Sequence, residues 1–383
     1  MKKLVNIKNL RKAIGRPMFA ARYLTGKIKA GLGYRFGRGY SMPPGRIFFA
    51  LTGRCNLKCS MCPQYNNETF QEEVAGRDDE ANIEELRAII DDIKSFNPIV
   101  TVSGGELFLH KSCLDFLSYI KSNRLLCSIG TNGTLLEKFA DVIVEMGIDD
   151  VSVSIDGPQE IHDAIRGVPG TYSRAVRGIE RVMEAKAKRG VTTPKITVIF
   201  TITPTNYKHL PEIVSIMESI GIDTLRIGHL NFLSQEAYDA QTDLTGKLFG
   251  VDQDTSWAGY VRQLDGFDAD WLADTIERIR NDTGRDMQIT FFPDFPKDEI
   301  PQYYSDKPFQ SRSFKNACMV PWDMAVIGPS AEVIICPNYE IGNLRDQKFR
   351  ELWNNERAKL FRRTIRKAKQ FPVCSRGCCF FYT

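Results

Sequence analysis

The chain has 383 residues and a mass of 43.4 kDa; 43% of its residues are hydrophobic and 26% are charged. This size and composition fit two or three domains, or one barrel with an appendage, and they exclude a disordered or collagen-like chain. No uncharged apolar run reaches the ~18 residues that a transmembrane helix needs, and basic residues interrupt the first apolar stretch, so neither a membrane span nor a signal peptide is expected. These features predict a cytoplasmic location, which is reducing. We therefore expect the ten cysteines to be metal ligands or buried thiols rather than disulfides.

The net charge of +4 is unevenly distributed along the chain. Residues 1–67 contain fourteen Lys and Arg and no acidic residue, and residues 341–383 contain eleven Lys and Arg against three acidic residues. If the two basic ends meet in space, they form a patch for an anionic partner. We do not expect that partner to be a nucleic acid.

Residues 1–45 look like a basic helical appendage. Apolar residues recur in it at helical spacing, with an interruption at Pro17; they are Ile7, Leu10, Ile14, Met18, Leu24, Ile28 and Leu32. We expect two helices that pack on the body of the protein. A peripheral contact with an anionic membrane remains the alternative, because the stretch combines apolar stripes with positive charge.

From residue 46 onward, β-rich apolar runs alternate with helical patterns. The runs lie at 46–52, 98–103, 126–131, 150–155, 196–202 and 223–229, and the helical patterns at 81–95, 111–122, 135–147, 172–189 and 208–220. Six strands separated by helices indicate an α/β fold in which crossover helices join parallel strands. On this pattern alone, an open barrel and a doubly wound sheet both remain open.

The second half of the chain is less regular. Between the α/β core (46–233) and a cysteine-bearing end (316–383) lies a connecting region, 234–315, with a helix expected at 268–281 and a short strand at 287–292. In the cysteine-bearing end we expect a β-hairpin at 323–336 and a basic helix at about 347–369.

A first cysteine cluster follows the first predicted strand. Cys55, Cys59 and Cys62 form a C-x3-C-x2-C pattern, and three thiolates so close in sequence can bind zinc, copper(I) or an iron–sulfur cluster. A structural zinc site closes with four ligands, but the next Cys or His residues are distant, at His110 and Cys113. Three ligands and one open corner favour an iron–sulfur cluster; a zinc knuckle or a group of buried thiols is the alternative.

This pattern, placed directly after the first strand, resembles the radical S-adenosylmethionine (radical SAM) superfamily. The resemblance implies a partial (β/α)6, TIM-like barrel over residues 46–233. It also implies a [4Fe-4S] cluster on Cys55, Cys59 and Cys62, whose open iron is chelated by S-adenosylmethionine.

Further motifs stand where the family would need them, at the ends of the predicted strands. By resemblance, the residues that bind S-adenosylmethionine are Met61, Gly104, Gly105, Glu106, Thr131, Asn132, Ser154, Asp156 and Arg166. Glu106 would accept a hydrogen bond from the ammonium group, and Arg166 would pair with the carboxylate. Ser154 and Asp156 would lie near the ribose or the substrate, and Met61 would contact the adenine through its backbone.

A second cysteine cluster lies in the last 66 residues: Cys318, Cys336, Cys374, Cys378 and Cys379. Four thiolates on zinc would fit these residues equally well. The segment, however, resembles the SPASM or twitch extension of radical SAM enzymes, with Ala331 in place of a customary glycine. This implies one auxiliary [4Fe-4S] cluster on Cys318, Cys336, Cys374 and either Cys378 or Cys379. The remaining thiol is a simple neighbour or a hydrogen donor to the substrate.

The remaining Cys and His residues show no metal-binding spacing. Cys113 and Cys127 are expected to be buried core thiols. For His229, at the end of the sixth predicted strand, a position facing the active site is an alternative to a purely structural one.

The resemblance implies an enzyme that reductively cleaves S-adenosylmethionine and uses the 5′-deoxyadenosyl radical to abstract hydrogen from a C–H bond, so that the substrate is oxidised, dehydrogenated or epimerised. A flavodoxin- or ferredoxin-type protein would be the reductant, and the basic ends could dock it. Only 45 residues precede the first strand, so we favour a small-molecule, sugar or lipid-linked substrate over a ribosomal peptide. A peptide-modifying maturase remains one alternative, and a non-enzymatic iron–sulfur or zinc protein is the alternative from another class.

Overall fold

The computed structural model of the protein describes residues 17–68, 71, 79–250, 255–312, 318–337 and 339–378. The first of the two predicted N-terminal helices and Cys379 lie outside these ranges. Within them, no helix is both long and apolar enough to cross a membrane.

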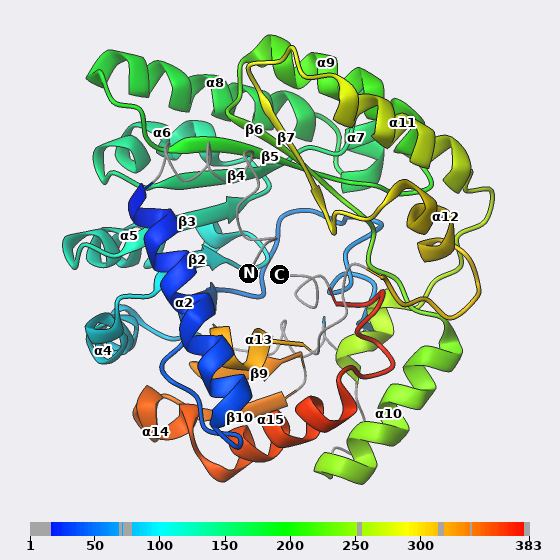
Figure 1. Ribbon diagram of the computed structural model, residues 1–383. Helices are drawn as coiled ribbons and strands as arrows, with labels where there is room; N and C mark the ends of the chain where they lie inside the picture. Colours follow the sequence, from blue (N-terminus) through cyan, green and yellow to red (C-terminus); the bar gives the residue numbers. More distant parts are fainter. Residues whose placement is uncertain are drawn as a thin grey trace.

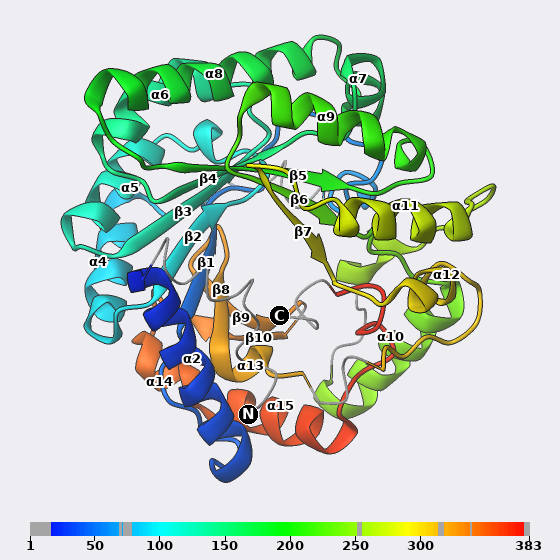
Figure 2. The same cartoon turned by 45° about the horizontal axis from the view of Figure 1, so that its top comes forward.

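One curved sheet of ten strands forms the centre of the fold (Figures 1 and 2). Seven of its strands are parallel and follow one another in sequence order: β1 (Arg46–Ala50), β2 (Ile99–Ser103), β3 (Leu126–Thr131), β4 (Asp150–Ser154), β5 (Lys195–Thr201), β6 (Thr224–Gly228) and β7 (Gln288–Phe292). All six predicted core strands are present. The strand predicted at 287–292 also exists, and it extends the barrel by pairing in parallel with β6.

Helices cover the outer face of this sheet (Figure 2). They are α4 (Ile83–Ile93), α5 (Cys113–Ser122), α6 (Leu136–Glu145), α7 (Gln159–Arg166), α8 (Thr171–Arg189), α9 (Leu210–Ile220) and α11 (Ala269–Asn281). Sequential strand order with helices on one side is the arrangement of an open barrel, so the doubly wound alternative is excluded.

The two faces of the strands carry different residues. Outward-facing side chains such as Val153, Phe200 and Leu225 are fully buried beneath the helices and form the core. The inward-facing side chains are mostly small and polar. A typical parallel barrel fills its interior with layers of branched apolar side chains. Because that filling is missing here, the interior of the barrel, which we call the lumen, stays open.

The cysteine-bearing end continues the same sheet. After α13 (Val320–Asp323), strand β8 (Met324–Ile327) pairs in parallel with β1, and β9 (Glu332–Cys336) and β10 (Tyr339–Asn343) follow as antiparallel strands. The predicted hairpin is thus confirmed. Ala331 lies in its turn with a φ of 66°, a left-handed conformation that explains why glycine would suit this position better.

The basic helix predicted at 347–369 is two helices, α14 (Phe349–Trp353) and α15 (Glu356–Ala368). The chain breaks between them because the Asn355 side chain accepts a hydrogen bond from the Ala358 N–H and caps the start of α15. Three further segments, α10 (Gln235–Phe249), the six-residue 3-10 helix η4 (Thr255–Tyr260) and α12 (Ile300–Tyr303), belong to the connecting region.

Helix α2 (Pro17–Phe36) begins at the proline where the helical pattern is interrupted, and it crosses the barrel in Figure 1. It packs on the body as predicted, but not through its apolar stripe. Its buried residues are Gly26, Ala30 and Gly33; a Cβ on Gly26 would stand 3.0 Å from the Cα of Gly45. The apolar residues that suggested packing are exposed instead: Met18, Leu24, Ile28 and Leu32. Close approach of the backbone, rather than side-chain hydrophobicity, decides which face is buried.

Candidate active site

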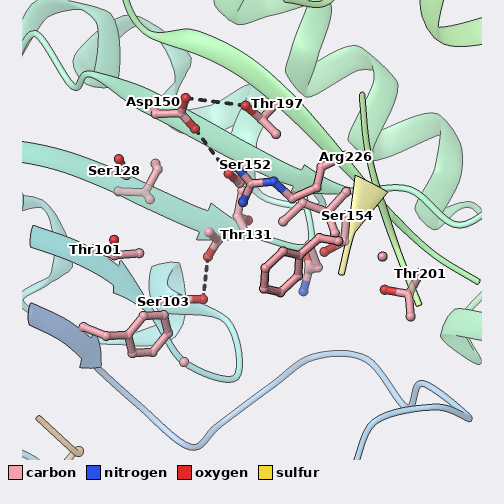
Figure 3. A pocket seen from close by; sticks show the side chains of 18 of the residues that line it. Thr101, Ser103, Ser128, Thr131, Asp150, Ser152, Ser154, Thr197, Thr201 and Arg226 are labelled. Carbon is pink, nitrogen blue, oxygen red and sulfur yellow. Dashed lines mark hydrogen bonds between the residues drawn. The ribbon is translucent and has the colours of Figure 1, made fainter. Parts of the chain in front are cut away.

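A cavity of about 2400 Å³ occupies the lumen and extends from the amino ends of the strands to their carboxyl ends, where the cysteine loop lies. Hydroxyl groups from strands β2 to β5 line it (Figure 3): Thr101, Ser103, Ser128, Ser152, Ser154, Thr197 and Thr201. Thr290 on β7 adds another. Nine Lys and Arg side chains line the cavity against four Asp and Glu carboxylates. The lumen is therefore a large, polar space that is rich in charged side chains.

The three cysteines of the C-x3-C-x2-C motif all line this cavity, on the loop that follows β1. Two sets of backbone hydrogen bonds hold the loop. The Gly105 N–H donates to the Thr52 carbonyl at 2.8 Å, which ties the loop to the end of β2. At the other side, Lys58 N–H donates to the Arg166 carbonyl at 3.1 Å, which ties the loop to the end of α7.

The glycines of the Gly104-Gly105-Glu106 motif are required by this loop. A Cβ on Gly104 would lie 2.4 Å from the Thr52 carbonyl oxygen, and a Cβ on Gly105 would lie 2.3 Å from the Arg54 carbonyl oxygen. Both distances are far inside van der Waals contact. The sequence predicts that these glycines make room for the methionine moiety of the cofactor; in the structure they first make room for the cysteine loop, while also lining the cavity.

The thiols of the loop interact electrostatically. Burial raises the pKa of the Cys59 thiol to about 11; the nearby guanidinium of Arg166 opposes this rise, whereas Cys62 and Cys55 add to it. Burial likewise raises the pKa of Cys55, and a thiolate at Cys62 would raise it further. A cationic iron cluster reverses this balance, because a bound metal favours the thiolate form.

The spacing of donor side chains also bears on the metal. Within the described ranges, no three or more Cys, His, Asp or Glu side chains gather closely enough to hold a single metal ion. One zinc ion would draw its thiolates to within about 4 Å of one another. The three thiols of the cysteine loop share one wall of the cavity, which matches the three-cysteine ligand set of an iron–sulfur cluster.

Arg166 and Asp156 form a buried ion pair beside the cysteine loop. The Arg166 Nε donates to Asp156 Oδ2 at 2.7 Å, a second nitrogen donates to the same oxygen, and Nη1 lies 3.7 Å from the Cys59 sulfur. Burial works to lower the pKa of Arg166, but Asp156 and Cys59 outweigh it, so the pKa is raised. Arg166 lines the cavity, and its contact with the cofactor stays a prediction. Asp156 is fully buried behind it and accepts the Thr201 N–H at 3.0 Å, so it positions Arg166 rather than facing the lumen.

Glu106 is also fully buried, and it organises the end of β3. Its carboxylate accepts hydrogen bonds from the Thr131 hydroxyl at 2.9 Å and from the Asn132 N–H at 2.8 Å, and burial raises its pKa. The bond from the cofactor's ammonium group to this carboxylate stays a prediction; in the structure the carboxylate holds the end of β3 in place. Asn132 in turn donates to Asn56 Oδ1 at 2.8 Å, which places its amide 4.0 Å from the Cys55 sulfur.

The other predicted cofactor contacts, Met61, Thr131, Asn132 and Ser154, line the cavity. The carbonyl oxygen of Met61 accepts a hydrogen bond from Arg262 at 3.4 Å. Sequence reasoning did not single out Arg262, which belongs to no motif, or Asn56, which occupies a variable position inside the cysteine motif. The alternation of hydroxyl residues along the strands was a signal that could have predicted the polar lumen.

The auxiliary cysteines are brought together as predicted. Cys318, Cys336, Cys374 and Cys378 line one cavity of about 300 Å³ whose other walls are mainly apolar. Burial raises the pKa of Cys318 to about 11 and that of Cys374 to about 12. Four thiols around one small dry cavity match the ligand set of a single cluster. This cavity and the lumen share Gly53, Gln64 and Glu80 in their walls, so the two sites are neighbours.

Cys113 and Cys127 are buried in the core, as expected, and burial raises the pKa of Cys127 to about 12. His229 borders the lumen but is only 5% exposed. Its Nδ1 lies 2.8 Å from the Tyr304 hydroxyl, and burial, with a smaller contribution from Arg280, lowers its pKa to about 3. The imidazole is therefore neutral at physiological pH.

Sequence and structure comparisons agree with this geometry. Residues 49–217 match the profile of the radical SAM superfamily, and residues 318–379 match that of the SPASM iron–sulfur cluster-binding domain. Among curated proteins, the Fe-coproporphyrin III synthase of Methanosarcina barkeri is 28% identical over 316 residues, which are 81% of this chain and 73% of that protein. An AdoMet-dependent heme synthase of Oleidesulfovibrio alaskensis is 27% identical over 80% of this chain and 74% of its own length.

A solved structure shows the same fold. The crystal structure of Streptococcus suis SuiB bound to S-adenosylmethionine superposes with a TM-score of 0.62, covering 95% of this chain and 78% of that chain. Sequence identity is 13%, so this likeness concerns the fold alone.

Proposed function

Because this chain belongs to the radical SAM superfamily and ends in a SPASM domain, we propose that it abstracts a hydrogen atom from a C–H bond of a small-molecule substrate held in the lumen. Its cofactors are S-adenosylmethionine, the [4Fe-4S] cluster that binds it, and an auxiliary [4Fe-4S] cluster. When bound, the first cluster and S-adenosylmethionine supply the 5′-deoxyadenosyl radical that performs the abstraction.

The residues described above would divide the work of binding. Cys55, Cys59 and Cys62 would hold the first cluster, and Cys318, Cys336, Cys374 and Cys378 the auxiliary one. Arg166, held rigid by Asp156, would pair with the carboxylate of S-adenosylmethionine. The backbones of Gly104, Gly105 and Met61, with the side chains of Thr131, Asn132 and Ser154, would line its site. The fourth auxiliary ligand is Cys378 in this proposal, because it shares the cavity with the other three thiols.

The observation that carries the proposal is the continuity between the cysteine loop and the hydroxyl-lined lumen. The lumen offers hydrogen-bonding groups along its length, which suits a polar small molecule, including a sugar or the head of a lipid-linked compound. The names of the curated relatives, which refer to an iron coproporphyrin and to heme, make porphyrins a further substrate class to test. A peptide maturase is the second candidate. The SuiB fold superposes on 95% of this chain, and SuiB is also solved with a bound precursor peptide.

The test is anaerobic reconstitution followed by dithionite and S-adenosylmethionine. Release of 5′-deoxyadenosine is expected from the wild type and from a Cys113→Ala control, and none from a Cys59→Ala variant. If the wild type, loaded with iron, releases none, the proposal fails. In a second assay, a flavodoxin or a ferredoxin, the proposed physiological electron donors, takes the place of dithionite. Deuterated candidate substrates then identify the class, because the abstracted deuterium appears in 5′-deoxyadenosine. The substrate product distinguishes dehydrogenation from epimerisation.

A further inference from the structure

We propose that Arg226 binds an anionic group of the substrate, a carboxylate or a phosphate, inside the lumen. This inference deepens the proposed function and rests on it in one respect: the bound anion belongs to a substrate only if the protein is the proposed enzyme. The binding itself requires no radical chemistry, so the two can fail separately.

Arg226 faces the lumen from the middle of β6. Its neighbours along the strand, Leu225 and Ile227, point outward and are fully buried, so strand alternation directs the guanidinium inward. The strand register places Arg226 opposite Ile199 on one side and Thr290 on the other. Figure 3 shows the side chain extending into the pocket.

The same row of the sheet continues to the predicted cofactor site. Ile199 is paired with Ser154 on β4, so Arg226 and Ser154 stand two strands apart, or about 9.5 Å. A group bound by Arg226 therefore lies within a small molecule's length of the cofactor pocket. That spacing suits a substrate anchored at one end and reactive at the other.

The guanidinium of Arg226 has no hydrogen bond or ion pair with any residue that the structure describes, although it is exposed within the lumen. Most other lumen cations are already paired. Arg46 and Lys27 bind Asp323, and Arg166 binds Asp156. At the far end of the lumen, Lys195 binds Asp223, and Arg285 binds Glu218.

The surroundings of Arg226 favour an anion over other ligands. Its planar group offers five N–H donors, which match the two oxygens of a carboxylate or phosphate. The Asp150 carboxylate, on the same side of the lumen, accepts the hydroxyls of Ser152 at 3.2 Å and Thr197 at 3.4 Å. Ion pairs neutralise most of the other lumen cations, so the positive charge that attracts an anion here is that of Arg226 itself.

The test is arginine-specific labelling of the reconstituted protein with phenylglyoxal, without reductant, followed by peptide mass spectrometry. Arg226 should react at least tenfold faster than Arg285, the ion-paired control in the same lumen. Inorganic phosphate and succinate, used as separate probes, distinguish the two ligand classes by which of them protects Arg226. Protection by either or both supports the proposal. Labelling of Arg226 that neither probe slows overturns it.

A second measurement covers a failure of labelling chemistry. In isothermal titration, the probe that protects Arg226 should bind the wild type and an Arg285→Gln control alike, and bind Arg226→Gln at least tenfold more weakly. Equal binding to all three proteins refutes the site. Protection of Arg226 in a wild type that never forms 5′-deoxyadenosine would refute the proposed function and leave the anion site standing.

A separate observation supports an interaction surface on α2. We infer that its exposed face, with the segment that follows, binds a membrane surface rich in anionic lipid. Twelve large apolar side chains are exposed in the described part of the chain, and seven of them belong to this surface: Met18, Leu24, Ile28, Leu32, Phe36, Tyr40 and Met42. Tyr23 is also exposed but lines the lumen, which Leu24 borders as well. Such a concentration on one short stretch of the chain is typical of a contact site.

The charge of the α2 surface suits anionic lipid. The stretch from 17 to 45 carries five Lys and Arg and no acid. Helix α15 lies beside it, since Arg366 donates to the Arg35 carbonyl at 3.2 Å, and it adds further exposed bases such as Lys367. Apolar side chains among bases form the pattern of an interfacial helix. A soluble acidic reductant would match the charge but leave the apolar side chains unused.

Sedimentation with vesicles tests this inference. At low salt, the wild type should bind phosphatidylglycerol-containing vesicles and not pure phosphatidylcholine. The triple variant Leu24→Ser, Ile28→Ser, Leu32→Ser should bind at least tenfold more weakly, whereas a control with Val191→Ser and Leu248→Ser, two exposed apolar residues elsewhere, should bind like the wild type. Failure of the wild type to sediment, or equal binding by the triple variant, refutes a lipid contact. A dimer that the triple variant abolishes would assign the face to a second copy instead.

Discussion

The substitution Gly105→Ala should disturb the first cluster although residue 105 is not one of its ligands. The added Cβ would stand 2.3 Å from the Arg54 carbonyl oxygen and 2.8 Å from that of Gly53. To relieve this contact, the Arg54 carbonyl must move away from residue 105 by roughly 1 Å, and overpacking of this kind costs about 1–3 kcal/mol. We expect the cysteine loop, rather than the end of β2, to move. Cys55 follows Arg54 directly, so its sulfur moves with the loop.

We expect Gly105→Ala to retain about four irons after anaerobic reconstitution, where the wild type retains about eight. Its affinity for S-adenosylmethionine should fall at least tenfold, which corresponds to about 1.4 kcal/mol. Iron analysis and anaerobic equilibrium dialysis measure the two quantities. Gly284→Ala is the matched control, because a Cβ there would meet nothing within 4 Å. Wild-type iron content and affinity in Gly105→Ala would show that the loop does not depend on this close approach.

Three further outcomes are expected. Alanine at all three cysteines of the C-x3-C-x2-C motif should leave about four irons per chain and abolish 5′-deoxyadenosine formation. Alanine at Cys318 and Cys336 should also leave about four irons, but this variant should still cleave S-adenosylmethionine without converting substrate. One equivalent of zinc in anaerobically purified protein would contradict an auxiliary iron cluster. Arg166→Ala should weaken S-adenosylmethionine binding by about 1.5–3 kcal/mol in anaerobic dialysis, and unchanged binding would show that Arg166 does not contact the cofactor. His229 has a pKa of about 3 when folded and about 6.5 when unfolded, so the unfolded chain binds more protons between these values and stability falls as pH drops through that window, by about 1.4 kcal/mol per pH unit. His229→Gln should flatten this dependence in thermal melts, and an unaltered slope would refute the assignment.

The sequence predicts the six core strands because each carries an apolar face that the helices cover. It does not predict that β7 pairs with β6 or β8 with β1, since such pairings depend on contacts far apart in the chain. The cysteine and glycine motifs lie together at the cavity, and only the folded structure reveals that the glycines accommodate the cysteine loop.

Other features carry too little local signal. Arg226 lies inside a strand without a motif, so nothing in its neighbourhood marks it as facing a cavity. Helical periodicity identifies the apolar stripe on α2 but not the face that packs, because Gly26 and Gly33 contribute contact through their lack of a side chain. The sequence places Asp156 just after the fourth strand, near the cofactor site. Its role as the partner of Arg166 could not be predicted, because it depends on how the end of β4 meets α7.

The pairing of β8 with β1 affects how electrons could move between the two cysteine sets. Strand β1 leads into the loop with Cys55, and β8 lies between Cys318 and Cys336, so adjacent strands about 4.8 Å apart support the two sites. Hydrogen bonds of the sheet, rather than a linker, fix their separation. Electron transfer between the clusters would then proceed at a distance that domain motion does not gate. A chain cut before β8 would lose more than its second cluster, because β1 would become an unpaired edge beside the first.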